Sequence, residues 1–209
     1  MFPLGSVSRS ITGIPFITVL IILANAGVFY LELTQGEAFI DRWSAVPSAI
    51  MAGREYETIL TSAFMHGGWL HIIGNMVFLW AFAPPMEEAM GPVKFLIFYL
   101  LGAIAAAAAH IYGDQSSTIP IVGASGAVAA VMGAFLVTYP RDSIRTLVLT
   151  PAVRVIYIPA IILIGLWIVL QVVSVSTEPQ QANAGGVAYL AHIGGAAFGI
   201  ITGRLFIWR

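Results

Sequence analysis

Four polar side chains that could together carry out acyl transfer lie in stretches that are otherwise apolar. They are Ser125, His192, and two residues spaced four apart, His71 and Asn75. A serine hydroxyl becomes an effective nucleophile when a base removes its proton, and histidine suits that role near neutral pH. His71 and Asn75 share one face of a helix and carry N–H donors, which a tetrahedral intermediate needs for its oxyanion.

The residues around Ser125 favour the same chemistry. Gly123 and Gly126 flank it without side chains and leave room for a substrate carbonyl. Ser125 is expected at a helix N-terminus, where free N–H groups and the helix dipole favour negative charge, so its own N–H is a third candidate donor. We find no Asp or Glu within the apolar stretches to orient His192, and the pattern therefore predicts a Ser–His dyad rather than a triad.

Each of these signals is weak when taken alone. A serine in a membrane helix commonly bonds back to its own backbone, and His71 with Asn75 could be an interhelical hydrogen-bonding pair and nothing more. Metal binding by His66 and His71 lacks a third ligand at useful spacing. The Gly-x-Ser-x-Gly turn of soluble hydrolases also fails, because the fifth residue is Ala127.

The composition indicates that lipid, not water, surrounds most of the chain. Of 209 residues, 59% are hydrophobic and 9% are charged, against about 25% charged in a soluble domain. The mean hydropathy is +0.92. Nine Lys and Arg residues form no basic patch, which argues against nucleic-acid binding. The absence of cysteine excludes disulfides, thiolate metal sites and a cysteine nucleophile.

Six apolar stretches are long enough to cross a bilayer, whose hydrocarbon core of about 30 Å needs about 20 helical residues. We expect spans over residues 15–33, 69–85, 93–111, 121–139, 155–175 and 187–208. The second, drawn to end at Pro84-Pro85, is short for a span, so we expect it either to start earlier or to continue beyond the prolines. The connection 34–68 is expected to form short interfacial helices. The predicted fold is all-α, a polytopic bundle of six transmembrane helices in a single domain, 1–209.

The basic residues support this topology independently. With a cytoplasmic N-terminus, six spans place seven of nine basic residues inside, as the positive-inside rule expects. The seven are Arg9, Lys94, Arg141, Arg145, Arg154, Arg204 and Arg209, and only Arg42 and Arg54 lie outside. Arg9, an apolar run and Ala24-Asn25-Ala26 also resemble a cleaved signal peptide. We favour a span, because the apolar run continues to Leu33.

This topology places the four polar residues at one depth. Spans two, four and six run from outside to inside, and each residue lies within the first two turns of its helix. Spans four and six also have small-residue faces that let backbones approach closely, as a Ser–His hydrogen bond requires. These faces comprise Ser125, Ala129 and Gly133 in span four, and Ala191, Gly195, Gly199 and Gly203 in span six.

Together these features resemble the rhomboid intramembrane proteases. The matching segments are His66-Gly67-Gly68-Trp69-Leu70-His71-Ile72-Ile73-Gly74-Asn75, Gly123-Ala124-Ser125-Gly126 and Ala191-His192-Ile193-Gly194-Gly195, with Gly199 beyond. Their order, their placement on spans two, four and six, and the six-span core resemble the simple prokaryotic form over nearly the whole chain.

The resemblance implies a serine endopeptidase that cleaves membrane proteins in or near their transmembrane segments without a metal or cofactor. Ser125 and His192 match the catalytic dyad of the family, His71 and Asn75 match its oxyanion residues, and Gly123-Ala124 match the start of its serine motif. It also implies a prokaryotic cell (inner) membrane, a site toward the outer side, and a gate formed by residues 155–186.

One segment departs from the family pattern. Many members carry a Trp-Arg pair in the first loop, where this chain has Glu57-Thr58, and Trp43 lies too far upstream to replace it. Because of this departure, the resemblance does not predict how the loop packs. The departure does not involve the proposed dyad.

Two other functions compete with proteolysis. An inactive rhomboid-like protein would bind membrane clients without cutting them, although the retention of both Ser125 and His192 argues against it. A small transporter would line a path across the bilayer with polar residues, whereas here they cluster at one depth, and spans three and five offer almost nothing polar.

Overall fold

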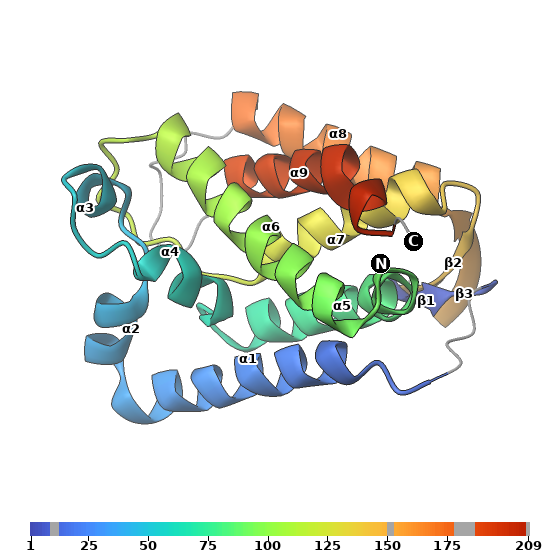
Figure 1. Cartoon of the computed structure of the whole chain (residues 1–209), viewed down its shortest axis with the longest axis horizontal. Coiled ribbons are helices and arrows are strands. Elements are labelled where there is room, and N and C mark those ends of the chain that lie inside the picture. The colour runs from blue at the N-terminus through green and yellow to red at the C-terminus, as the bar shows by residue number, and fades with distance from the viewer. Residues whose placement is uncertain (9–12, 150–152, 178–186, 208–209) are drawn as a thin grey trace.

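The computed structural model describes residues 1–8, 13–149, 153–177 and 187–207. Long helices lie side by side along the long axis of the molecule (Figure 1). The six principal helices are α1 (Phe16–Gln35), α5 (Trp69–Met90), α6 (Pro92–Gly113), α7 (Ser125–Thr138), α8 (Ala160–Thr177) and α9 (Tyr189–Ile207). Arg9, Trp208, Arg209 and the predicted loop 178–186 lie outside the described residues.

Five of these helices are long and apolar enough to cross a membrane. They contain 18 to 22 residues, which corresponds to about 27–33 Å at 1.5 Å per residue. The helix α7 has only 14 residues, or about 21 Å, and is shorter than a hydrocarbon core of about 30 Å. The predicted helical membrane bundle is thus confirmed, and of its six principal helices α7 is the one shorter than the hydrocarbon core.

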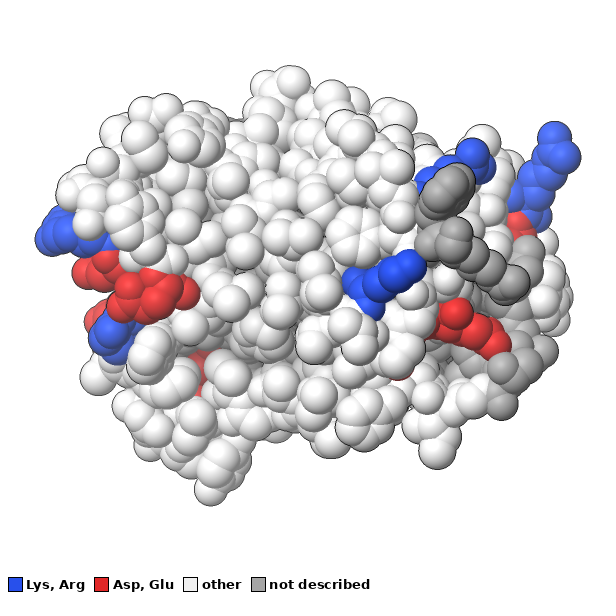
Figure 2. Space-filling model, in the orientation of Figure 1, with Lys and Arg blue, Asp and Glu red and all other residues white. Residues whose placement is uncertain are grey.

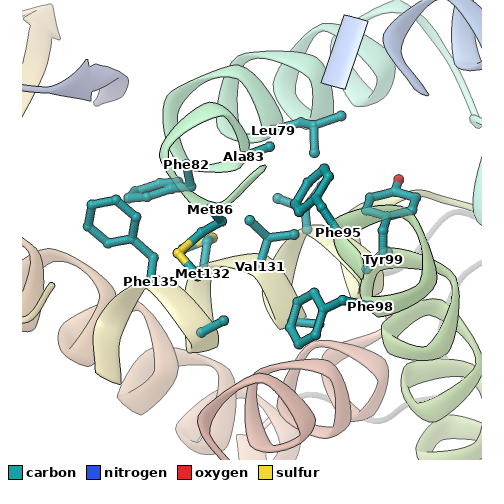
Figure 3. Packing of buried hydrophobic residues seen from close by; sticks show 14 of the residues in the cluster. Leu79, Phe82, Ala83, Met86, Phe95, Phe98, Tyr99, Val131, Met132 and Phe135 are labelled. Carbon is teal, nitrogen blue, oxygen red and sulfur yellow. The ribbon is translucent and has the colours of Figure 1, made fainter. Parts of the chain in front are cut away.

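The helix α7 forms the centre of the bundle. Its residues 126–135 are all buried, because neighbouring helices cover every side of it. Figure 3 shows aromatic and methionine side chains of α5 and α6 packed around Val131, Met132 and Phe135. The rings of Phe82 and Phe135 meet edge to face with centroids 5.3 Å apart. This packing holds α7 rigidly.

Small residues allow α9 to contact α7 along its length. A Cβ atom added at Gly195 would overlap the carbonyl oxygen of Gly126, and one added at Gly199 would overlap that of Ala130. Only glycine permits backbones to approach this closely, as is common between membrane helices. The predicted small-residue faces therefore do form the contact between spans four and six.

Three helix boundaries differ from those drawn on the sequence, and for the second span the continuation beyond the prolines was one of the two expected alternatives. The second span continues beyond Pro84-Pro85 to Met90, although both prolines lie inside the helix and lack the N–H that would bond to the preceding turn. The fourth span starts at Ser125 rather than at residue 121. The fifth starts at Ala160, because residues 155–159 belong to a strand.

A three-stranded antiparallel sheet, which we did not expect, lies at one end of the bundle (Figure 1). Its order is β1 (Phe2–Ser6), β2 (Ser143–Leu149) and β3 (Val153–Pro159). The strand β3 has the β-branched and aromatic residues typical of strands, and Pro159 ends it. Ile144 of β2 is fully buried in the main core and anchors the sheet to the bundle.

The connection between α1 and α5 forms short helices, as predicted. They are α2 (Glu37–Trp43), α3 (Pro47–Met51), α4 (Thr58–Thr61) and the 3-10 helix η1 (Ser62–Phe64). Ala45 pairs with Ile121 through two backbone hydrogen bonds, and the N–H of Gly123 donates to the carbonyl of Ser62 at 2.9 Å. This connection therefore holds the segment that leads into Ser125.

Charged residues gather at the two ends of the molecule. Figure 2 shows them around the short helices at one end and near the sheet at the other, with a broad band between them that is nearly free of charge. Glu87, near the C-terminus of α5, is a buried carboxylate that accepts the backbone N–H groups of Ile17 and Thr18 at 2.8 Å each. Glu87 thereby caps the N-terminus of α1 and ties it to α5.

Candidate active site

Ser125 and His192 lie in direct contact, as their chemistry requires. Ser125 is the first residue of α7 and His192 is the fourth residue of α9. The Ser125 Oγ and His192 Nε2 atoms are 2.7 Å apart. The helices α5, α7 and α9 all run in the same direction, from the side of the bundle that carries α2–α4 toward the side that carries the sheet (Figure 1). The predicted common depth of these residues thus follows from the helix directions.

The ring of His71 presents a donor toward the same place. Its Nδ1 accepts a hydrogen bond from the backbone N–H of Gly67 at 3.3 Å. A neutral imidazole carries one proton, so Nε2 of His71 is the protonated nitrogen. A Cβ atom placed on Gly123 would lie 2.8 Å from this nitrogen and 3.6 Å from Ser125 Oγ. His71 therefore aims an N–H beside the serine.

Gly123 occupies a position that favours glycine for two reasons. Its φ of +131° lies in a region that residues with side chains rarely adopt. A side chain here would also collide with the His71 ring. The Gly123 N–H is already bonded to Ser62, so Gly123 contributes space rather than a free donor.

Asn75 lies one helical turn beyond His71 on α5. Its side chain is buried, and its Nδ2 atom has no hydrogen-bond partner among the described residues. A buried donor without a partner is costly unless a ligand or intermediate uses it. The N–H of Ser125 lies in the first turn of α7, where helices leave such groups free. Ala124 is fully buried, so its part in the site is limited to its backbone.

Gln171 was missed by the sequence reasoning. This residue of α8 places its Oε1 atom 2.7 Å from Nδ1 of His192, on the opposite side of the ring from Ser125. The available signal was an amide within a long apolar helix, where a polar side chain normally has a purpose. Our prediction considered only carboxylates as partners for His192, and it judged span five to be almost without polar groups.

His66 lies behind His71. Its backbone N–H donates to the Glu32 carboxylate at 2.9 Å, and the rings of His66 and His71 have centroids 5.2 Å apart. Burial, together with the nearby His71, lowers the pKa of His66 to about 4, so its ring is neutral at pH 7. Among the described residues, no three His, Cys, Asp or Glu side chains come together to hold a metal ion.

The departing sequence Glu57-Thr58 lies at the start of α4, away from these side chains. Thr58 is buried, and its hydroxyl donates to the carbonyl of Glu55 at 2.6 Å. Glu57 pairs with Arg42 at 3.0 Å. Hydrogen bonds from its own backbone and from Arg42 lower the pKa of the Glu57 carboxyl. This part of the loop is therefore stabilised by local contacts.

Comparison with known proteins identifies relatives for most of the chain. The family profile of the Rhomboid domain matches residues 53–209. The chain is 27% identical over 198 residues to RHOMBOID-like protein 12, mitochondrial, of Arabidopsis thaliana, covering 87% of this chain and 56% of that protein. It is 27% identical over 170 residues to Rhomboid protein 1, mitochondrial, of Saccharomyces cerevisiae, covering 77% of this chain and 46% of that protein.

A bacterial protein matches a smaller part. The chain is 30% identical over 128 residues to Rhomboid protease GluP of Bacillus subtilis, covering 59% of this chain and 25% of that protein. The chain spans about half the length of the two mitochondrial relatives. Because those relatives are mitochondrial, the comparison does not support our prediction of a prokaryotic membrane. An integral membrane location agrees with the apolar helices.

Proposed function

The chain belongs to the rhomboid family, and on that premise we propose that it is an intramembrane serine endopeptidase with Ser125 as nucleophile and His192 as base. The observation that carries the proposal is the distance of 2.7 Å between Ser125 Oγ and His192 Nε2. This distance lies within the range for a nucleophile and its base.

The reaction would proceed by acyl transfer. His192 Nε2 accepts the hydroxyl proton while Ser125 Oγ attacks the carbonyl carbon of the scissile peptide bond. The tetrahedral intermediate collapses when the C–N bond breaks, and His192 gives its proton to the departing amine. A water molecule then loses a proton to His192 and attacks the acyl carbon. The bond between that carbon and Ser125 Oγ breaks, and His192 returns the proton to Oγ, which releases the second product and restores the serine.

Three donors are proposed to bind the oxyanion. They are the Nε2–H of His71, the Nδ2–H of Asn75 and the backbone N–H of Ser125. Their support is the tautomer of His71, the unpartnered and buried amide of Asn75 and the helix N-terminus. Donors fixed before the reaction stabilise developing charge without having to reorganise.

The proposed substrates are transmembrane proteins that reach the site from the bilayer. The short helix α7 supports this proposal, because a helix shorter than the hydrocarbon core can begin within it, and Ser125 would then lie where lipid-embedded segments are available. A substrate helix must unwind locally, because in an intact helix each backbone carbonyl is engaged in a hydrogen bond and lies close to the helix axis. No nucleic acid and no cofactor has a part in this scheme.

The test is cleavage of a single-span substrate by purified protein in liposomes. The wild type is compared with Ser125→Ala and with Ser116→Ala, a matched change at an exposed serine. Cleavage by the wild type and Ser116→Ala but not by Ser125→Ala would support the protease. Cleavage by all three would show that Ser125 is not the nucleophile.

A fluorophosphonate label separates a protease from a non-catalytic client binder. A protease with a demanding substrate would leave the test substrate intact and still react with the label at Ser125. A client-binding protein would also leave the substrate intact, but it would not react with the label. The label requires only an activated serine and does not depend on the substrate chosen.

The orientation of the chain is also a proposal. Cytoplasmic N- and C-termini would place the sheet, with Arg145 and Arg154, on the cytoplasmic side and the site toward the outer side, in agreement with the distribution of basic residues. Labelling of single cysteines introduced at Ser6 and Ser116 by an impermeant maleimide in intact cells would test it. Reaction at Ser6 but not at Ser116 would reverse the orientation.

A further inference from the structure

Gln171 is a polar side chain in α8, which is the most exposed of the five helices long enough to cross a membrane. Of the 18 residues of α8, only Ala160, Ile164 and Gln171 are buried. Placing an amide in such a helix is unfavourable unless its donor and acceptor are used. The two amide atoms of Gln171 do have partners, and these partners define how the group is oriented.

The nitrogen of the amide is bonded within α8. Gln171 Nε2 donates to the carbonyl oxygen of Trp167, one turn earlier, at 3.4 Å. The amide oxygen therefore faces His192, where Oε1 and Nδ1 are 2.7 Å apart. Because an amide oxygen only accepts, His192 Nδ1 must carry the proton, and Nε2 is left with a lone pair.

That lone pair is the one that accepts the proton of Ser125. The second ring nitrogen of a histidine sets which tautomer is present, and this choice decides whether the ring can act as a base. Trp167 adds a further constraint, since its ring lies against His192 with centroids 5.5 Å apart and planes at 36°. Two side chains of α8 thus hold the His192 ring. Gln171 forms a hydrogen bond at its edge, and the Trp167 ring lies against its face.

We propose that Gln171 is a positioning residue that holds His192 in its catalytically competent tautomer and orientation. This inference rests on the proposed function and adds to it. Gln171 is neutral and does not stabilise the imidazolium by charge, so its effect is smaller than that of a carboxylate. Its position on α8 also makes the alignment of the base depend on α8 lying against α9.

The test compares substitutions that remove or keep the acceptor. Gln171→Leu removes the amide oxygen, and Gln171→Met removes it while keeping an unbranched shape. Gln171→Glu keeps an acceptor at the same reach in either protonation state. For each variant, the rate of fluorophosphonate labelling at Ser125 and the kcat and KM for substrate cleavage are measured on folded protein.

The expected result is that Gln171→Leu and Gln171→Met each lower kcat and the labelling rate by about 10–100-fold, the usual effect of losing a group that orients a functional histidine. KM stays within about twofold, and Gln171→Glu restores most of the rate. The control is Val169→Ala, an exposed residue of the same helix, which leaves both rates unchanged.

Two outcomes would overturn the inference in distinguishable ways. If the wild type reacts with the label and both acceptor-free variants react equally fast, only the positioning role fails. The same conclusion follows if Gln171→Glu is as slow as Gln171→Leu, because Gln171 then serves packing alone. If the wild type neither reacts with the label nor cleaves substrate, the proposed function fails and this inference fails with it.

Discussion

The helices α7 and α8 both supply groups to the candidate site, but they are held in very different ways. Residues 126–135 of α7 are all buried, whereas three residues of α8 are buried and most of its surface faces outward. Among the six principal helices, the proposed nucleophile is therefore on the most enclosed one, and the groups that hold the proposed base are on the most exposed one.

This difference separates two requirements of catalysis. The nucleophile and the oxyanion donors must keep their geometry, which a close-packed helix provides. The helix α8 has little buried surface to hold it, so displacing it costs less than displacing α7. Movement of α8 would leave Ser125 in place and remove the alignment of His192.

The largest effect is expected from the residues that meet between α7 and α9. Ser125→Ala and His192→Ala should each reduce kcat by about 10⁴–10⁶-fold, and the double variant should be little worse, because the two residues act as one unit. Single-turnover cleavage in liposomes measures this. Strictly additive losses would argue against a dyad.

A smaller effect is expected from the donor on α5. Asn75→Ala should reduce kcat by about 10–10³-fold, because His71 and the Ser125 backbone would still bind the oxyanion. Asn75→Asp offers a comparison that keeps size but replaces the donor with an acceptor, and it should be at least as slow. Unchanged kcat in both variants would remove Asn75 from the proposed oxyanion site.

A pair of glycine substitutions tests the contrast in packing directly. Gly199→Ala would force a Cβ atom into the carbonyl of Ala130, whereas Gly165→Ala on α8 meets nothing within 4 Å. We expect Gly199→Ala to lower stability by about 1–3 kcal/mol and Gly165→Ala to leave it unchanged or raise it by up to about 1 kcal/mol. Thermal unfolding in one detergent measures both, and equal shifts would contradict the contrast.

The smallest effect is expected on the outward face of α8. Leu166→Ala removes a side chain that is 59% exposed, so little buried surface is lost and stability and labelling of Ser125 should stay close to the wild type. The same assay that detects Gln171→Leu serves as the comparison. A large loss of labelling in Leu166→Ala would show that α8 is held by contacts on that face.

Much of the site could be predicted because polar residues are rare in apolar spans. Ser125, His192, His71 and Asn75 stood out for that reason, and counting spans placed them at one depth. Gln171 could not be assigned in the same way, because which group faces His192 depends on how α8 turns and packs. Likewise, the bonds of Ala45 and Ser62 to the segment before Ser125 join backbones distant in the sequence.

The fold was predicted in outline and missed at specific boundaries. Hydropathy locates apolar segments, but it does not separate a strand from the start of a span, so residues 155–159 were placed in a helix rather than in β3. The prolines of α5 had the opposite effect, because the span was drawn to end at them whereas the helix continues. Neighbouring helices can accommodate the missing N–H bonds in a membrane, so Pro84-Pro85 did not end the helix.

The order of the helices along the chain has a consequence for biosynthesis. Ser125 and His192 are 67 residues apart, an interval of about 3–13 s at a synthesis rate of roughly 5–20 residues per second. During that time the nascent chain carries the proposed nucleophile without its base. A protease of the proposed kind would therefore reach the membrane as an inert chain and would become active only when α9 has been inserted against α7.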